Sequence, residues 1–80
     1  MKKYAAVAMI GNHNLINGHG SVECTVKDVE FVKDCDDRME LIKEYAFRPT
    51  EYKDNGKWYS YSVMKRTEAS RLLKQFDKLG

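Results

Sequence analysis

The chain is poor in the features that define several large classes of protein. It has no run of about 18 apolar residues, so no transmembrane helix is predicted. Its two cysteines, Cys24 and Cys35, are too few for a disulfide framework, and both are expected to be small buried side chains in a reducing, cytoplasmic setting. The net charge is only +2, so charge alone does not indicate a partner.

The length of the chain limits what it can build. Eighty residues form a single domain, 1–80, and Leu, Ile, Val and Phe make up about a fifth of them, which is enough for a folded protein of modest stability. Little material is left for a deep active-site cleft. The size therefore favours a binding protein over an enzyme, and no cofactor is expected.

The first third of the chain predicts two antiparallel strands. Residues 3–10 are apolar and continuous, too short for a secretory signal, and typical of a strand covered on both faces. Residues 11–20 are rich in Gly and Asn, which predicts a long loop. Residues 22–32 alternate apolar and polar side chains, which indicates a half-buried strand with a bulge or bend at Asp28.

The period changes to that of a helix after residue 34. We expect Asp34 to cap this helix and Pro49 to end it. The residues expected on its buried face share helical spacing, with Leu41 and Tyr45 beside them. They are Cys35, Met39, Ile42 and Ala46.

The last third predicts a strand and a second helix. Asn55 and Gly56 form a turn before a strand over 57–64, in which Tyr61 and Val63 face the core. Trp58 alternates with serines, so we expect its side chain to be at least partly exposed. Thr67 is the expected cap of the final helix. Its apolar positions repeat at helical spacing and are Ala69, Leu72, Leu73, Phe76 and Leu79. The expected fold is α+β, with a three-stranded antiparallel sheet packed on two helices in the order β-β-α-β-α.

The charge is unevenly distributed along the chain. Residues 28–51 carry a net charge of −4, whereas residues 52–80 carry +4. An acidic helix suits contact with a basic protein, and large aromatic side chains anchor interfaces. The residues predicted to bind a protein partner are Asp34, Asp36, Asp37, Glu40, Glu44, Trp58 and Tyr59.

The basic end supports a second hypothesis, a small nucleic-acid-binding regulator. Aromatic residues on a sheet can stack on bases while surrounding cations contact phosphates. The alternative is that these cations are the solvated face of an ordinary helix and that the aromatic residues belong to the core. The residues of this hypothetical nucleic-acid surface are Lys57, Lys65, Arg66, Arg71, Lys74 and Lys78.

Metal binding and catalysis have little support in the sequence. His13, His19, Cys24 and Cys35 are possible zinc ligands, but their spacing matches no common zinc module. Either histidine could act as a general base, although no nucleophile and no phosphate-binding loop accompanies them. We therefore expect no metal site and no catalytic residues.

The whole chain resembles, at the level of a class, the small proteins that bacteriophages make to disable host machinery, such as anti-CRISPR proteins. The resemblance rests on the Met1–Lys3 start, the β-β-α-β-α layout, the acidic stretch Asp34–Glu44 and the lack of a catalytic motif. It implies a viral, non-enzymatic inhibitor that acts by stoichiometric protein–protein contact. The implied target is a bacterial complex that processes nucleic acid, in the host cytoplasm and away from any membrane.

Overall fold

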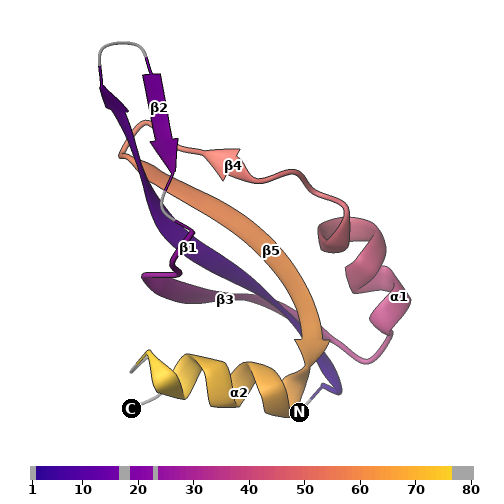
Figure 1. The fold of residues 1–80 in the computed structure, drawn as a ribbon. Coiled ribbons are helices and arrows are strands. Elements are labelled where there is room, and N and C mark those ends of the chain that lie inside the picture. The colour runs from indigo at the N-terminus through magenta and orange to yellow at the C-terminus, as the bar shows by residue number, and fades with distance from the viewer. Residues whose placement is uncertain (1, 17–18, 23, 77–80) are drawn as a thin grey trace.

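The computed structural model describes residues 2–16, 19–22 and 24–76, and for residues 15, 16 and 19–22 it describes the backbone alone. Four strands form the main antiparallel sheet in the order β3-β1-β5-β4 (Figure 1). Their bounds are β1 (Tyr4–Ile16), β3 (Asp28–Cys35), β4 (Glu51–Tyr52) and β5 (Lys57–Lys65). The α+β class and the antiparallel sheet are confirmed. The expected strand number and the expected element order β-β-α-β-α are wrong, because β4 adds an edge strand to the sheet and β2 (His19–Val22) is a further strand between β1 and β3 in the chain.

β1 is an inner strand, paired with β3 on one side and β5 on the other, and its side chains pack on both faces of the sheet. Residues 5–8 are at most 1% exposed, which confirms the expected coverage of both faces. Ala5 and Val7 belong to one apolar cluster, and Ala6 belongs to another on the opposite face. Small side chains at alternate positions let a helix approach each face closely.

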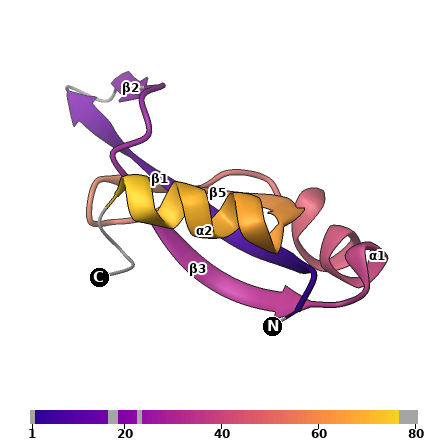
Figure 2. The ribbon, with the colours of Figure 1, turned by 90° about the horizontal axis from the view of Figure 1, so that it is seen from below.

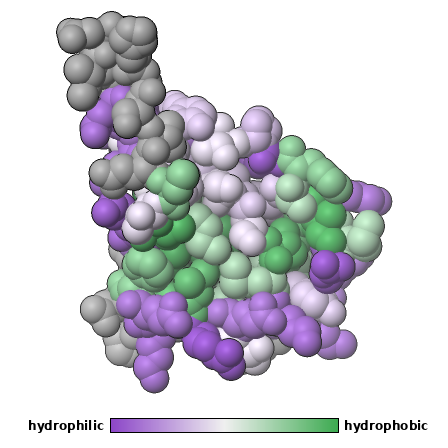
Figure 3. All heavy atoms as spheres, in the orientation of Figure 1, coloured by the Kyte–Doolittle hydropathy of each residue, from purple (hydrophilic) through white to green (hydrophobic). Residues whose placement is uncertain are grey.

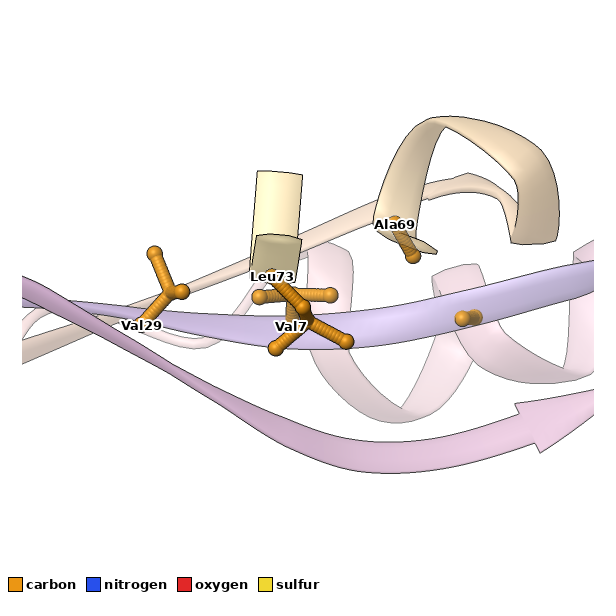
Figure 4. Close-up of a cluster of buried hydrophobic side chains, with 5 residues drawn as sticks. Val7, Val29, Ala69 and Leu73 are labelled. Carbon is orange, nitrogen blue, oxygen red and sulfur yellow. The ribbon is translucent and has the colours of Figure 1, made fainter. Parts of the chain in front are cut away.

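A helix covers each of these two faces (Figures 1 and 2). On one face, α2 (Arg66–Gln75) packs on the sheet, where Ala69 and Leu73 meet Val7 and Val29 (Figure 4). On the other, α1 (Arg38–Leu41) continues into a π-helical turn, η1 (Ile42–Ala46). We call these the α2 face and the α1 face of the sheet.

The segment expected to be a loop, residues 11–20, is mostly strand. β1 continues to Ile16 and pairs with β2 (His19–Val22) as an antiparallel hairpin (Figure 1). The backbone N–H of His13 also donates to the Gly56 carbonyl at 2.8 Å, which ties this part of β1 to the β4–β5 turn. Pairing with distant strands has overridden the turn preference of Gly and Asn.

The second predicted strand is divided. β2 ends at Val22, the chain bends at Thr25, and β3 begins at Asp28. β1 and β3 are antiparallel, as expected, but the bulge lies where their register shifts between Ala6 and Val7. Cys24 precedes β3 and is exposed, so the expectation that it is buried is wrong.

The first helix begins later than expected and buries a different face. Asp34 pairs with Ala5 inside β3, and the cap is Asp37, whose carboxylate accepts a hydrogen bond from the Met39 N–H at 3.0 Å. The buried side chains are Leu41 and Tyr45. Leu41 and Tyr45 are four residues apart, an ordinary helical spacing, but the predicted face was counted from Cys35, which lies in β3 before the helix begins.

The second helix confirms its predicted face. Ala69 is fully buried, Leu73 is 2% exposed, and Leu72 and Phe76 pack against the same cluster. α2 follows β5 directly with Lys65 as its cap, so Thr67 lies in the first turn rather than before it. Leu79 lies outside the described residues.

Candidate binding surface

The acidic group next to α1 forms contacts within the chain. Asp36 pairs with the Lys2 ammonium at 3.8 Å and accepts a hydrogen bond from the Lys3 N–H at 3.1 Å. Asp34 lies 3.8 Å from the Arg66 Nε atom. These contacts place cations of the chain itself beside two of the predicted partner-binding carboxylates and lower the local negative charge.

Two further acids on α1 and η1 have partners of their own. Glu44 accepts a hydrogen bond from the Lys33 ammonium at 3.3 Å, and this bond raises the pKa of Lys33 above its ordinary value. The Cys35 thiol donates to Glu40 at 3.2 Å. Both carboxylates belong to exposed residues. The acidic cluster is therefore a surface feature, but part of its role is to hold α1 and η1 against β3.

An exposed apolar patch lies on α1 and η1. Met39 is 53% exposed and Phe47, directly after η1, is 82% exposed, with Ala46 exposed beside it. Figure 3 shows apolar side chains gathered over this helix at the right of the molecule. Met39 and Ala46 were expected to face the core, whereas the structure turns them outward. Sequence analysis did not single out Phe47, although it lies directly before Arg48 and Pro49, where the helix ends.

Arg48 holds the chain in place after the apolar patch. Its guanidinium stacks over the rings of Tyr45 and Tyr61, 4.7 and 5.4 Å from their centroids, and its Nε atom donates to the Glu44 carbonyl at 2.8 Å. Tyr45 is 7% exposed, and burial, followed by the Glu44 charge, raises its pKa. These contacts restrict the backbone beside Phe47, which lowers the entropy lost when that side chain is covered.

The two aromatic residues of β5 that were predicted to bind a partner have largely or partly buried side chains. Trp58 is only 8% exposed, so the prediction that its side chain is at least partly exposed is wrong. Its indole lies over Gly11, its partner on β1, because glycine has no side chain to occupy that space. Tyr59 is half-buried, and the Lys53 ammonium lies 5.6 Å from its ring centroid.

The proposed nucleic-acid residues do not form one surface. Lys57 and Lys65 begin and end β5 and are therefore roughly 26 Å apart. The Arg66 guanidinium lies over the Phe31 ring and donates a hydrogen bond to the Ser70 hydroxyl. Arg71 and Lys74 are exposed on α2, and Lys78 lies outside the described residues.

A basic cluster does form at the start of α2, where two of the proposed nucleic-acid residues meet two lysines that the sequence did not group with them. Lys65 and Arg66 line a cavity of about 340 Å³ together with Lys2 and Lys3. These lysines come from opposite ends of the chain, so charge counted along contiguous segments missed the cluster. The antiparallel pairing of Tyr4 with Lys65 brings them together.

His13, a candidate zinc ligand and general base, makes structural contacts instead. The His13 Nε2 atom lies 3.0 Å from the Lys53 carbonyl oxygen, so this nitrogen donates, and the ring packs edge-on against Tyr52. His13 thus joins β1 to the β4–β5 hairpin. The side chain of His19 lies outside the description. Among the described residues, no three His, Cys, Asp or Glu side chains are grouped as metal ligands would be.

Comparisons of the chain with models of known protein families, with characterised proteins and with solved structures find no match. No helix in the described part of the chain is long and apolar enough to cross a membrane.

Proposed function

We propose that this chain is a non-enzymatic binding protein that acts through α1, η1 and the residue that follows them. The observation that carries the proposal is the exposure of Phe47 and Met39 on a segment that Arg48 holds in place. A large side chain that is left in water gains most when a partner covers it, and such side chains dominate the energy of interfaces.

The acids around the apolar patch indicate the chemistry of the partner. Asp36, Asp37, Glu40 and Glu44 are exposed next to Met39 and Phe47 along the chain. A partner with an apolar pocket rimmed by Lys or Arg would complement this arrangement, and the charges would accelerate its association. Proteins that handle nucleic acid present such basic rims.

The class-level resemblance to phage proteins supports a more specific form of the proposal. The chain then acts as a stoichiometric inhibitor of a bacterial nucleic-acid-processing complex, in the host cytoplasm. The acidic surface would occupy a site on the target that otherwise holds a phosphate backbone.

The test begins with a tagged copy of the chain in bacterial lysate, followed by affinity measurements on the protein that co-purifies. Phe47→Ser should weaken binding by about 2 kcal/mol or more, roughly 30-fold, with little change in thermal stability. Tyr52→Ser is the matched control, because Tyr52 is an aromatic residue that is 58% exposed on β4, outside the patch. Equal affinities for the folded Phe47 variant and the wild type would refute the proposal.

A small nucleic-acid-binding regulator is the alternative, and the basic cluster beside α2 favours it. Four cations around one cavity could contact phosphates. A gel-shift assay with random DNA and RNA at several salt concentrations tests this, with Lys65→Glu as the variant. Binding that falls steeply with salt and is lost in Lys65→Glu would support the alternative over protein binding.

A further inference from the structure

We propose that the outer edge of β5, at Tyr61 and Val63, is a docking site for an extended segment of a protein partner, which joins the sheet as an additional strand. This surface is distinct from the apolar patch, and the inference does not depend on the proposed function. It rests on the backbone pairing of β5, on the protection of the opposite edge and on the charges beside the open one.

The hydrogen-bonding pattern shows which way each peptide group of β5 points. The Arg66 N–H donates to the Lys3 carbonyl, so even-numbered residues along β5 bond to β1. The Lys53 N–H donates to the Lys57 carbonyl, so odd-numbered residues bond to the other side. β4 pairs with β5 only as far as Tyr59. Beyond it, the N–H and C=O groups of Tyr61 and Val63 point outward, and no described residue bonds to them.

The opposite edge of the sheet is protected. In β3, the outward N–H of Val29 is bonded by the carboxylate of its neighbour Asp28 at 2.9 Å. A bulge further along β3 interrupts its register with β1. Carboxylates and bulges are common means of preventing strand addition. Their presence on β3, together with unpaired groups at Tyr61 and Val63, makes β5 the edge that accepts a strand.

The open edge lies between the two helices and leads into a cavity. α2 lies on one side of β5 and α1 on the other, with the edge between them (Figure 1). At the end of the strand is a cavity of about 370 Å³ between the beginnings of the two helices, lined by Tyr4, Arg38, Val63, Met64, Lys65 and Glu68. A strand laid along the edge would place a side chain in this cavity.

The charges beside the edge indicate an acidic segment. Arg38 and Lys65 line the cavity, and no ion pair with either is present among the described residues. Arg48 lies over the Tyr61 ring, on the α1 face of the strand. Glu68 is the single acid among the residues lining the cavity. A carboxylate on the added strand would therefore meet an excess of cations.

A second copy of the chain fits this edge poorly. Two β5 strands paired antiparallel with Tyr61 opposite Val63 would place Lys65 of the second copy opposite Tyr59, where Glu51 of β4 already lies. Pairing with Val63 opposite Val63 avoids β4, but it places Lys65 of each copy opposite Tyr61, whose ring Arg48 covers, so that cations face cations. A short segment of about five residues avoids β4, because the open stretch from Ser60 to Lys65 is only about 20 Å long.

Amide hydrogen exchange and NMR titration test the proposal on the intact protein. In the free protein, the amides of Tyr61 and Val63 should exchange much faster than those of Ser60 and Ser62, which bond to β1. The probe is a capped heptapeptide of alternating valine and glutamate, and its counterpart has lysine in place of glutamate. The glutamate peptide should shift and protect the Tyr61 and Val63 amides in a saturable manner, and the lysine peptide should bind at least tenfold more weakly.

A matched pair of variants isolates the backbone contribution. Val63→Pro removes an outward N–H without breaking a bond to β1, whereas Val63→Ala loses similar packing and keeps the N–H. Val63→Pro should bind the glutamate peptide at least tenfold more weakly than Val63→Ala. If Val63→Pro does not fold, Lys65→Glu replaces it and should weaken binding of the glutamate peptide by a similar factor.

Several results would overturn the proposal. One is slow exchange at Tyr61 and Val63 in the free monomer. A second is protection of these amides that rises with protein concentration, because a second copy would then be the occupant. Equal binding of the two peptides, or no saturable shift at millimolar concentrations of the glutamate peptide, would also overturn it.

Discussion

The contact between Trp58 and Gly11 is the clearest case in which a single residue determines the surface of this protein. Gly11 pairs directly with Trp58, and the indole occupies the space above the glycine. Alternation with serines suggested that Trp58 faces solvent. Polar neighbours on a strand do not reveal whether the opposite residue on the next strand leaves room for a large ring.

A methyl group at Gly11 should displace the indole. A Cβ atom there would overlap the Trp58 ring, so Gly11→Ala is expected to cost about 1–3 kcal/mol through overpacking. Fluorescence provides the measurement: the wild type should emit at short wavelength and resist iodide quenching. The variant should shift to longer wavelength and be quenched more strongly. Gly11→Ala with wild-type stability and emission would contradict this packing.

Gly56 offers a comparison in which space is not the constraint. Its φ is +79°, and the nearest atom to an added Cβ would be the His13 carbonyl oxygen at 3.4 Å. Gly56→Ala should therefore be destabilising by about 1–2 kcal/mol through backbone strain, without any change in Trp58 emission. The two variants distinguish a steric from a conformational requirement for glycine.

At the scale of elements, α2 is the helix whose packing follows directly from its sequence. Leu73 is 2% exposed and meets Val7 and Val29. Leu73→Ala should lower the free energy of unfolding by about 2–5 kcal/mol, which would bring a small domain close to unfolding. Lys74→Ala, on the exposed side of the helix, should change it by less than about 0.5 kcal/mol. Denaturant midpoints of the two variants provide the comparison.

The α1–η1 segment provides a second test, because the expected and the observed buried faces differ. Leu41 is fully buried, whereas Met39 is 53% exposed. Leu41→Ala should cost about 2–5 kcal/mol, and Met39→Ala should cost less than about 0.5 kcal/mol. The reverse order of costs, measured by urea unfolding, would show that the helix buries the face predicted from the sequence, which includes Met39. Asp37 caps this helix, so charge reversal at Asp36 and Asp37 would disturb the fold as well as any interface.

For the whole molecule, one ion pair on the β4–β5 hairpin connects stability to pH. A hydrogen bond from Lys53, 2.8 Å away, holds the pKa of Glu51 below its ordinary value of 4.5. Because the folded pKa is the lower one, this contribution is present above about pH 4.5 and is lost as the pH falls through the folded value. The difference in urea midpoint between the wild type and Glu51→Gln should therefore shrink in acid.

Lys53→Met is the control for this pH effect. It removes the same ion pair from the other side, so its profile should match that of Glu51→Gln. A difference between the wild type and Glu51→Gln that stays constant between neutral pH and pH 3 would assign the loss of stability to something other than the carboxylate.

The candidate binding site was predictable only in part. The acids Asp36, Asp37, Glu40 and Glu44 are exposed, as their helical context indicated. The ion pair of Asp36 with Lys2 joins two distant segments, and that of Glu44 with Lys33 joins a helix to a strand within one segment, so segment charges could reveal neither. Phe47 was missed because an apolar residue before Pro49 looks like the end of a core helix.

The sequence by itself determined those features that depend on neighbouring residues. The spacing of Ala69, Leu73 and Phe76 specifies the buried face of α2, and Asn55 with Gly56 specifies the β4–β5 turn. The apolar run through residues 5–8 specifies a strand covered on both faces. In each case local backbone preference and side-chain period agree with the final packing.

Only the tertiary structure decided the features that depend on distant pairings. Gly11, Asn12 and His13 extend β1 because β5 and the β4–β5 turn accept their backbone groups. The burial of Trp58 depends on the absence of a side chain at Gly11, 47 positions away in the sequence. The open edge at Tyr61 and Val63 exists because β4 ends its pairing at Tyr59. Strand register and edge pairing join residues whose separation in sequence carries no periodic signal, so the physical determinant is the complementarity of whole strands.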